Sequence, residues 1–169
     1  QAITKYDRFD LKGEEFYWRN DYAFAGDADS VRRHVVRMLK SKFFTFNVIR
    51  NEVGYNGEIR HYKVDCKRYQ RTYMNTPRMY WEGEWTGKFT VEVLQGGYKV
   101  TIYALYFEKP EKSTGYYRTE KFVKGRYFDA VTKKQGTTLK KNEFPNLALM
   151  SMSLKDDFDI RNTVAPENN

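Results

Sequence analysis

The chain is poor in the residues from which disulfides, metal sites and membrane spans are built. It has a single cysteine, Cys66, which excludes an internal disulfide and a multi-thiolate metal site. Its two histidines, His34 and His61, show no spacing typical of metal ligands. No stretch approaches the roughly 20 consecutive apolar residues that a membrane-spanning helix needs. We therefore expect no metal, no cofactor and no membrane span.

Positive charge and aromatic side chains are abundant instead. Lys and Arg number 30 against 22 Asp and Glu, which gives a formal net charge of +8, and 17% of the residues are aromatic. Such a charge suits polyanionic partners: nucleic acid, anionic head groups or envelope polysaccharide. The chain begins with Gln1 rather than Met, so we expect that a signal peptide has been removed and that the protein is exported to the periplasm or cell envelope.

Two segments carry the spacing of amphipathic helices. The first opens with acidic residues suited to a helix N-terminus, Asp27 among them, and the second opens with Pro145, suited to a first turn. Their apolar positions, three or four residues apart, are Val31, Val35, Met38 and Leu39, then Leu147, Met150, Leu154 and Phe158.

Alternation of apolar and polar residues predicts strands in the rest of the chain. It runs through 15–24, 43–52, 58–69, 80–93 and 98–108, and 110–141 is polar with a possible further strand or short helix. A Gly96-Gly97 turn would pair Val93 with Val100.

These elements predict an α+β fold, with a curved antiparallel sheet packed against two helices. The expected order is strand, helix, four or five strands, helix. We expect one domain over 1–169, with a core of about 15–159 and loose ends at 1–12 and 162–169.

The stretch MYWEGEWTGKF, residues 79–89, places Glu82 and Glu84 two positions apart. In a strand they would lie on one face, roughly 6.6 Å apart, a separation that glycosidase carboxyl pairs also span. Those enzymes place carboxyl groups on opposite sides of a bond, whereas these two stand side by side on a face that continues with Thr86 and Lys88. Strict alternation favours a solvated face. The sequence offers no other set of acid, base and nucleophile, so we predict that the protein is not an enzyme, with glycan hydrolysis by this pair as a further hypothesis.

The segment KRYQRTYMNTPRMYW interleaves basic and aromatic residues. We predict a binding surface there, made of Lys67, Arg68, Tyr69, Arg71, Tyr73 and Arg78. The function predicted first is a non-enzymatic exported or envelope-associated binding domain, whose ligand is an envelope polyanion or a protein. The same composition suits single-stranded nucleic acid, although the chain has neither an RNP-type aromatic signature nor a basic recognition helix.

An alternative places the ligand inside the protein. Trp81, Gly83, Trp85 and Phe89 fall on the apolar face of the 80–93 strand, and the glycines leave gaps between the large side chains. A cavity between the sheet and the C-terminal helix would suit a small apolar ligand.

Three sequence stretches resemble the TBP-like family of uncharacterised exported proteins from gut anaerobic bacteria. They are FAGDADSVRRHVVRMLKSKF, the turn YNGEI and the long strand WEGEWTGKFTVEV, within a likeness over about 15–159. The strand order is also similar to that of helix-grip domains. The family resemblance implies no catalytic residues, and the name of the fold does not imply DNA binding.

Overall fold

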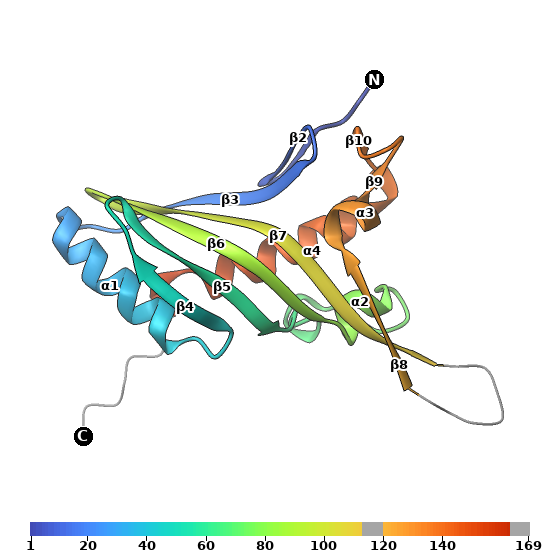
Figure 1. Ribbon diagram of the computed structural model, residues 1–169. Helices are drawn as coiled ribbons and strands as arrows, with labels where there is room; N and C mark the ends of the chain where they lie inside the picture. The colour runs from blue at the N-terminus through green and yellow to red at the C-terminus, as the bar shows by residue number, and fades with distance from the viewer. Residues whose placement is uncertain (113–119, 163–169) are drawn as a thin grey trace.

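A large antiparallel sheet with helices against one face forms the molecule (Figure 1). The computed structural model describes residues 1–112 and 120–162. The strands of this sheet are β1 (Lys5–Tyr6), β2 (Phe9–Lys12), β3 (Glu15–Ala23), β4 (Thr45–Arg50), β5 (Gly54–Tyr62), β6 (Glu84–Leu94), β7 (Gly97–Lys112) and β8 (Glu120–Arg126). The helices are α1 (Ala28–Ser41), α2 (Arg78–Trp81), α3 (Tyr127–Val131) and α4 (Phe144–Asp157), with short 3-10 turns η1 (Lys67–Tyr69), η2 (Lys141–Glu143) and η3 (Ile160–Asn162). A separate small ribbon consists of β9 (Thr132–Lys133) and β10 (Thr138–Leu139). The predicted α+β class is confirmed.

The longest strand, β7, joins the two halves of the sheet. Within the described residues the strand order is β1-β2-β3-β7-β6-β5-β4, and β8 adds to β7. One edge of β7 pairs with β6. The other edge has two partners, β3 from Gly97 to Tyr103 and β8 from Tyr106 to Lys112. The change of partner therefore falls at Ala104 and Leu105.

Both predicted long helices are confirmed. Asp27 caps α1 by accepting a hydrogen bond from the backbone N–H of Ser30 (2.8 Å). Pro145 lies in the first turn of α4. The apolar positions expected for the two helices are all buried, namely Val31, Val35, Met38, Leu39, Leu147, Met150, Leu154 and Phe158. Figure 1 shows both helices against the same side of the sheet, and the opposite side, called the open face from here on, is left without them.

Aromatic side chains of the helix-covered face donate hydrogen bonds into and just beyond α4. The indole N–H of Trp18 donates to Ser151 Oγ (3.0 Å), and the hydroxyl of Tyr22 donates to the carbonyl of Lys155 (2.7 Å). The hydroxyl of Tyr98 donates to the carbonyl of Phe158 (2.8 Å). Burial raises the pKa of Tyr22 and of Tyr98. These residues contribute apolar area while their polar groups keep partners.

The expectation of a loose N-terminal end at 1–12 is wrong. Strands β1 and β2 extend the sheet, and Phe9 and Leu11 alternate into the core. Phe9 is fully buried and its ring stacks on that of Phe16, with 5.1 Å between centroids. Gly13, with φ +61°, turns the chain back into β3. At the other end, Asn162 closes η3, and the rest of the expected loose end lies outside the described residues.

The strand predicted over 80–93 begins four residues later than expected. Residues Arg78–Trp81 form α2, and β6 starts at Glu84. Tyr80, expected on the wet face, is buried and donates to the hydroxyl of Tyr127 (3.0 Å). The alternation from Glu84 onward is as predicted.

The register of the β6–β7 hairpin differs from the expected one by two residues. Val91, not Val93, pairs with Val100. The turn residues are Gln95 and Gly96, since Leu94 pairs with Gly97 and Gly96 has φ +77°. A shift of two leaves every side chain on its expected face, which is why the pattern could not reveal it.

Bulges bend three strands of the sheet. Asn47 in β4, His61 in β5 and Ala104 in β7 have positive φ angles of 53°, 57° and 51°. The pairing slips by one residue beside each of them. A bulge inserts a residue into one strand and bends it, so these three account for the curvature that was expected of the sheet.

Candidate ligand-binding pocket on the open face

The bulge at Ala104 turns two successive side chains of β7 onto the open face. Ile102 and Leu105 are buried, whereas Tyr103 and Ala104 between them are exposed. Tyr106 then points outward again, and is 36% exposed against 39% for Tyr103. A strictly alternating strand would have placed Tyr103 and Tyr106 on opposite faces. The bulge brings them to the same one.

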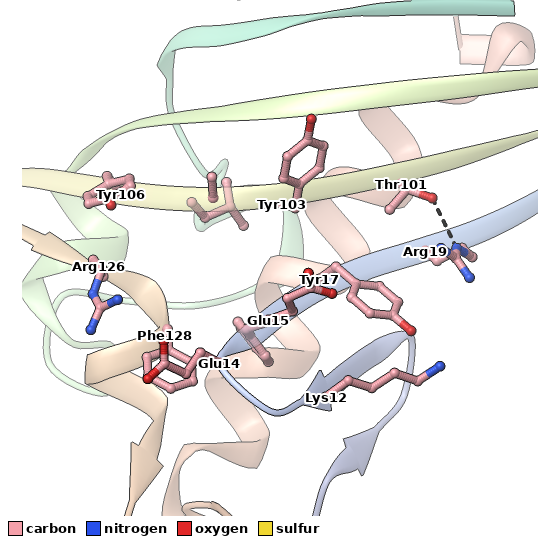
Figure 2. A pocket seen from close by; sticks show the side chains of 13 residues that line it. Lys12, Glu14, Glu15, Tyr17, Arg19, Thr101, Tyr103, Tyr106, Arg126 and Phe128 are labelled. Carbon is pink, nitrogen blue, oxygen red and sulfur yellow. Dashed lines mark hydrogen bonds between the residues drawn. The ribbon is translucent and has the colours of Figure 1, made fainter. Parts of the chain in front are cut away.

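A pocket of about 570 Å³ lies where β7 changes partner. It is lined by Lys12, Glu14, Glu15, Phe16, Tyr17, Arg19, Thr101, Tyr103, Ala104, Leu105, Tyr106, Arg126 and Phe128. Figure 2 shows Tyr17 and Arg19 on one side, Arg126 and Phe128 on the other, and Tyr103 on β7 between them. The volume is within the range of about 300–1,000 Å³ that is typical of small-molecule sites.

Charged side chains surround the aromatic rings of this pocket. The guanidinium of Arg19 lies 4.8 Å from the ring centroid of Tyr17, and its Nε donates to Thr101 Oγ1 (3.0 Å). The guanidinium of Arg126 lies 5.2 Å from the ring centroid of Phe128. Arg126 also makes two hydrogen bonds of 2.9 Å to Asp129, and these raise the pKa of the guanidinium. The aromatic rings and cations are thus held in place by contacts within the protein.

A second, smaller pocket of about 260 Å³ adjoins the first. It is lined by Glu58, Ile59, Arg60, Thr86, Gly87, Lys88, Ala104 and Tyr106, so both pockets share Ala104 and Tyr106. Glu58 accepts hydrogen bonds from Asn47 (3.0 Å) and Arg60 (2.6 Å). These two hydrogen bonds lower the pKa of Glu58 and favour its carboxylate form.

The predicted basic surface is partly engaged in contacts within the chain. Tyr69 donates to Asp156 (2.7 Å), and Arg71 donates to the side chain of Asn146 (2.6 Å), so the segment is tied to α4. Burial, with help from Asp156, raises the pKa of Tyr69.

The other residues of that surface are more open. Arg78 pairs with Glu82, and Arg68 lies 3.7 Å from Asp156. Lys67 is exposed, and Tyr73 is 71% exposed. No residue predicted for the basic surface lines either pocket. The binding role of this segment stays a prediction.

The residues expected to line an interior cavity pack tightly instead. Trp85 and Phe89 are fully buried. The Trp85 ring lies edge-on to Tyr127, with 4.9 Å between centroids, and Phe89 lies 5.8 Å from Phe158. Aromatic rings therefore occupy the space that a ligand was expected to fill, and neither described pocket is lined by Trp81, Gly83, Trp85 or Phe89.

The glycines of this stretch have structural explanations. A Cβ at Gly83 would lie 2.0 Å from the carbonyl oxygen of Met79, and one at Gly87 would lie 3.0 Å from Leu105 Cδ2. The expected gaps beside the tryptophans are filled by close approach of neighbouring groups.

Glu82 and Glu84 do not form a carboxyl pair on one strand. Glu82 follows α2 and pairs with Arg78, while Glu84 opens β6 with its carboxylate 3.7 Å from His61. Over residues 1–112 and 120–162, no group of three or more His, Cys, Asp or Glu side chains is placed to hold a metal ion. Within the same ranges no helix is long and apolar enough to cross a membrane.

Sequence reasoning missed the open-face pocket. Its residues come from the end of β2, the β2–β3 turn and β3 on one hand, and from β7, β8 and α3, much later in the chain, on the other. The available signal was the run IYALYF, residues 102–107, where alternation of apolar and polar residues fails. A failure of period two inside a strand is typical of a bulge.

Comparisons with known proteins give one informative likeness. No protein-family model and no curated protein matches the chain. A solved structure of a DUF4468 family protein from Bacteroides ovatus ATCC 8483 is similar, with a TM-score of 0.51 and 12% identity. The alignment covers 96% of this chain and 94% of that one. At such identity the likeness shows the fold alone.

That likeness agrees with part of the expected resemblance. The similar protein belongs to an uncharacterised family and comes from a gut anaerobe. Its name assigns it no activity, ligand or catalytic residue. The likeness is one of fold, a large open antiparallel sheet with few helices. Function therefore has to be argued from the site itself.

Proposed function

We propose that the protein is a non-enzymatic binding domain and that its ligand binds in the open-face pocket. The observation that carries this proposal is the pocket of about 570 Å³ at the point where β7 exchanges β3 for β8. Partly exposed tyrosines and fixed cations converge there. A concave site with aromatic walls and a few oriented polar groups is typical of ligand recognition.

The composition of the pocket favours binding over catalysis. The described residues of its lining include no His, Cys or Ser, and therefore no imidazole base and no serine- or cysteine-type nucleophile. Two of its guanidinium groups already have partners, Thr101 for Arg19 and Asp129 for Arg126. A guanidinium stays protonated, so these two groups can position a ligand by hydrogen bonds and charge rather than exchange a proton with it.

The proposal includes export to the periplasm or envelope and a TBP-like relationship. Both rest on the sequence resemblance, and the likeness to the solved structure supports only the α+β fold. Expression of the full-length gene product in a Bacteroides host, followed by fractionation, tests the location. Recovery in the cytoplasm alone would contradict export.

The binding site is tested with a panel of probes and two matched variants. The probes are a heparin oligosaccharide, a mixture of neutral glycans, a random peptide pool, a single-stranded DNA oligonucleotide and oleate, with microscale thermophoresis as the readout. Tyr103→Ala removes a ring from the pocket, and Tyr73→Ala removes an exposed ring from the basic segment.

We expect at least one class of probe to bind, with affinity lowered about tenfold by Tyr103→Ala and unchanged by Tyr73→Ala. The opposite pattern would move the site to the basic segment. Binding of oleate with quenching of tryptophan fluorescence, unaffected by Tyr103→Ala, would support the interior alternative. Failure of every probe to bind at millimolar concentration would also overturn the proposal.

A further inference from the structure

The two pockets of the open face adjoin each other, and together they are called the groove from here on. Tyr106 and Ala104 line both of them, so they are neighbours across the bulge of β7. Thr86 lies directly opposite Tyr106, and Lys88 pairs with Tyr103 on one side and with Glu58 on the other. The groove therefore crosses the strands, from β3 and β8 over β7 and β6 to β5. An occupant that fills it is longer than either pocket alone.

Both signs of charge occur along the described lining of the groove, with cations in modest excess, and Lys124 lies just outside it over the Tyr106 ring. The lining has five cationic residues, Lys12, Arg19, Arg60, Lys88 and Arg126, and three carboxylates, Glu14, Glu15 and Glu58. Arg60 is bonded to Glu58, and Arg126 is bonded to Asp129 just outside the lining. The strong one-sign field that a polyanion requires is not concentrated here, despite the net charge of +8 of the whole chain.

An apolar ligand fits this groove poorly as well. A fatty acyl chain laid along it would take Arg19, Lys88 and Glu58 out of water without offering them a hydrogen bond. Such groups lower the affinity for a lipid and raise it for a ligand that is itself rich in donors and acceptors.

The remaining chemistry is that of a polar, uncharged chain with apolar faces. Tyr103 supplies a ring against which the C–H face of a sugar can pack. Arg19 and Lys124 already lie over the rings of Tyr17 and Tyr106, at 4.8 and 5.9 Å from their centroids. Guanidinium groups donate paired hydrogen bonds and carboxylates accept them, and neighbouring sugar hydroxyls both donate and accept. A lining that combines aromatic rings with paired polar groups suits an oligosaccharide, whose sugar units carry C–H faces and hydroxyl edges.

We propose that the ligand is a neutral oligosaccharide that lies across both pockets, with one part beside Tyr17 and Tyr103 and the other between Tyr106 and Lys88. This inference rests on the proposed function, because it takes the larger pocket to be a binding site. The structure assigns no particular sugar, so the testable property is the dependence of affinity on chain length.

The experiment combines a length series with variants in each half of the groove. Neutral β-glucan, α-mannan, xylan and chitin fragments are screened on a glycan array, and the best binder is titrated calorimetrically from the disaccharide to the octasaccharide. Tyr103→Ala changes the larger pocket and Lys88→Ala the smaller one. Lys99→Ala is the matched control, because Lys99 pairs with Glu92 on neighbouring strands and lines neither pocket.

We expect the affinity to rise with chain length until both pockets are filled. Tyr103→Ala lowers the affinity about tenfold at every length. Lys88→Ala lowers it only for the longer oligosaccharides, and Lys99→Ala leaves it unchanged. Circular dichroism and the melting temperature verify that each variant is folded.

The possible failures are distinguishable. An affinity that is independent of chain length, or that Lys88→Ala lowers equally at all lengths, would overturn the inference that one ligand spans both pockets. Absence of glycan binding, together with a peptide or polyanion that binds in a manner sensitive to Tyr103→Ala, would overturn the sugar assignment and leave the proposed function standing. If the affinity of every probe that binds is unchanged by Tyr103→Ala, both the proposed function and the oligosaccharide inference are wrong.

Discussion

The two faces of the sheet use aromatic residues in opposite ways. On the helix-covered face, Trp18, Tyr22 and Tyr98 are buried and give their hydrogen bonds to α4 and the residues just after it. On the open face, Tyr103 and Tyr106 remain partly exposed beside charged groups. The same residue type therefore holds the fold together on one side and offers a surface for a ligand on the other.

The two faces differ in the hydrogen-bond partners of their tyrosines rather than in residue type. A buried tyrosine needs a fixed acceptor for its hydroxyl, and the backbone of α4 and its C-terminal end supplies such acceptors. An exposed tyrosine is satisfied by water, and its ring is left for a partner from outside. The two faces should consequently respond to mutation in different ways.

The largest difference is expected from removal of one ring on each face. Trp85→Ala should lower the free energy of unfolding by about 3–5 kcal/mol, because Trp85 is fully buried among aromatic rings. Tyr106→Ala should lower it by about 1 kcal/mol or less, since Tyr106 is partly exposed on the open face. Urea titration followed by circular dichroism measures both. Similar losses for the two variants would erase the distinction between the faces.

Addition of a methyl group at Gly83 should also be costly. The new Cβ would meet the carbonyl oxygen of Met79 at 2.0 Å, so α2 must move away from the start of β6. We expect Gly83→Ala to lower the free energy of unfolding by about 1–3 kcal/mol. Thr86→Ala, an exposed change in the same strand, is the control for which little loss is expected. A neutral Gly83→Ala variant would show that this junction is loose enough to admit a ligand.

Relief of the bulge in β7 should have a smaller effect of opposite sign. Ala104 has φ +51°, a conformation that glycine adopts without steric cost. Ala104→Gly should therefore raise the free energy of unfolding by about 1 kcal/mol or less, net of the greater freedom of glycine in the unfolded chain. Thermal denaturation of this variant beside Ala23→Gly, at an exposed strand position where glycine brings no relief, separates the two contributions. Equal destabilisation by both would argue against the bulge conformation.

The smallest expected effect is a change in how the free energy of unfolding depends on pH. Burial raises the pKa of Asp157, although Tyr62 donates a hydrogen bond to its carboxylate (2.6 Å) and Lys42 lies near it. Because the folded-state pKa lies above the unfolded value of about 3.9, this group favours the folded state below that value, and the contribution is lost as the pH rises through the folded-state pKa. Arg68 and Asp156 are its other charged neighbours, and Ser153 shares the hydroxyl of Tyr62 with it.

Asp157→Asn removes this titration and keeps an oxygen that can accept from Tyr62. We expect wild type to lose stability relative to the variant as the pH is raised from about 4 toward neutrality. Urea unfolding at a series of pH values measures the difference. A difference that grows in the opposite direction would mean that Asp157 is stabilised as a carboxylate. Tyr103→Ala on the open face should leave the pH profile unchanged.

Much of the fold could be predicted because local patterns specify it. The period of 3.6 and the acidic cap identify α1, and the period of two identifies the buried side of β3 and β6. The short strands β1 and β2 were not predicted, because two apolar positions, Phe9 and Leu11, are too few to show a period of two. The start of β6 was misplaced because α2 interrupts a run that happens to alternate.

The candidate site depended on information that no local pattern holds. Tyr103 and Tyr106 share a face only because Ala104 takes a conformation that its residue type disfavours. The larger pocket needs the pairing of β3 and β8 with successive parts of one edge of β7, and such long-range pairing cannot be derived from composition. The basic segment attracted attention by charge, yet four of its residues have partners within the chain, namely Arg68, Tyr69, Arg71 and Arg78.

The two partners on one edge of β7 also bear on the order in which the chain folds. Strands β5, β6 and β7 are consecutive neighbours in the sheet, and a tight turn joins β6 to β7. Strand β3 lies much earlier in the sequence, so a long loop must close before Ala23 pairs with Gly97. Closing a long loop costs more entropy than closing a short one, so we expect the β5–β6–β7 meander to form first and β3 to dock later. Pulse-labelling hydrogen exchange should then show amides of β6 protected before those of β3. The larger pocket, beside Tyr17, forms only when β3 docks. Ligand binding in this pocket would therefore report that folding is complete.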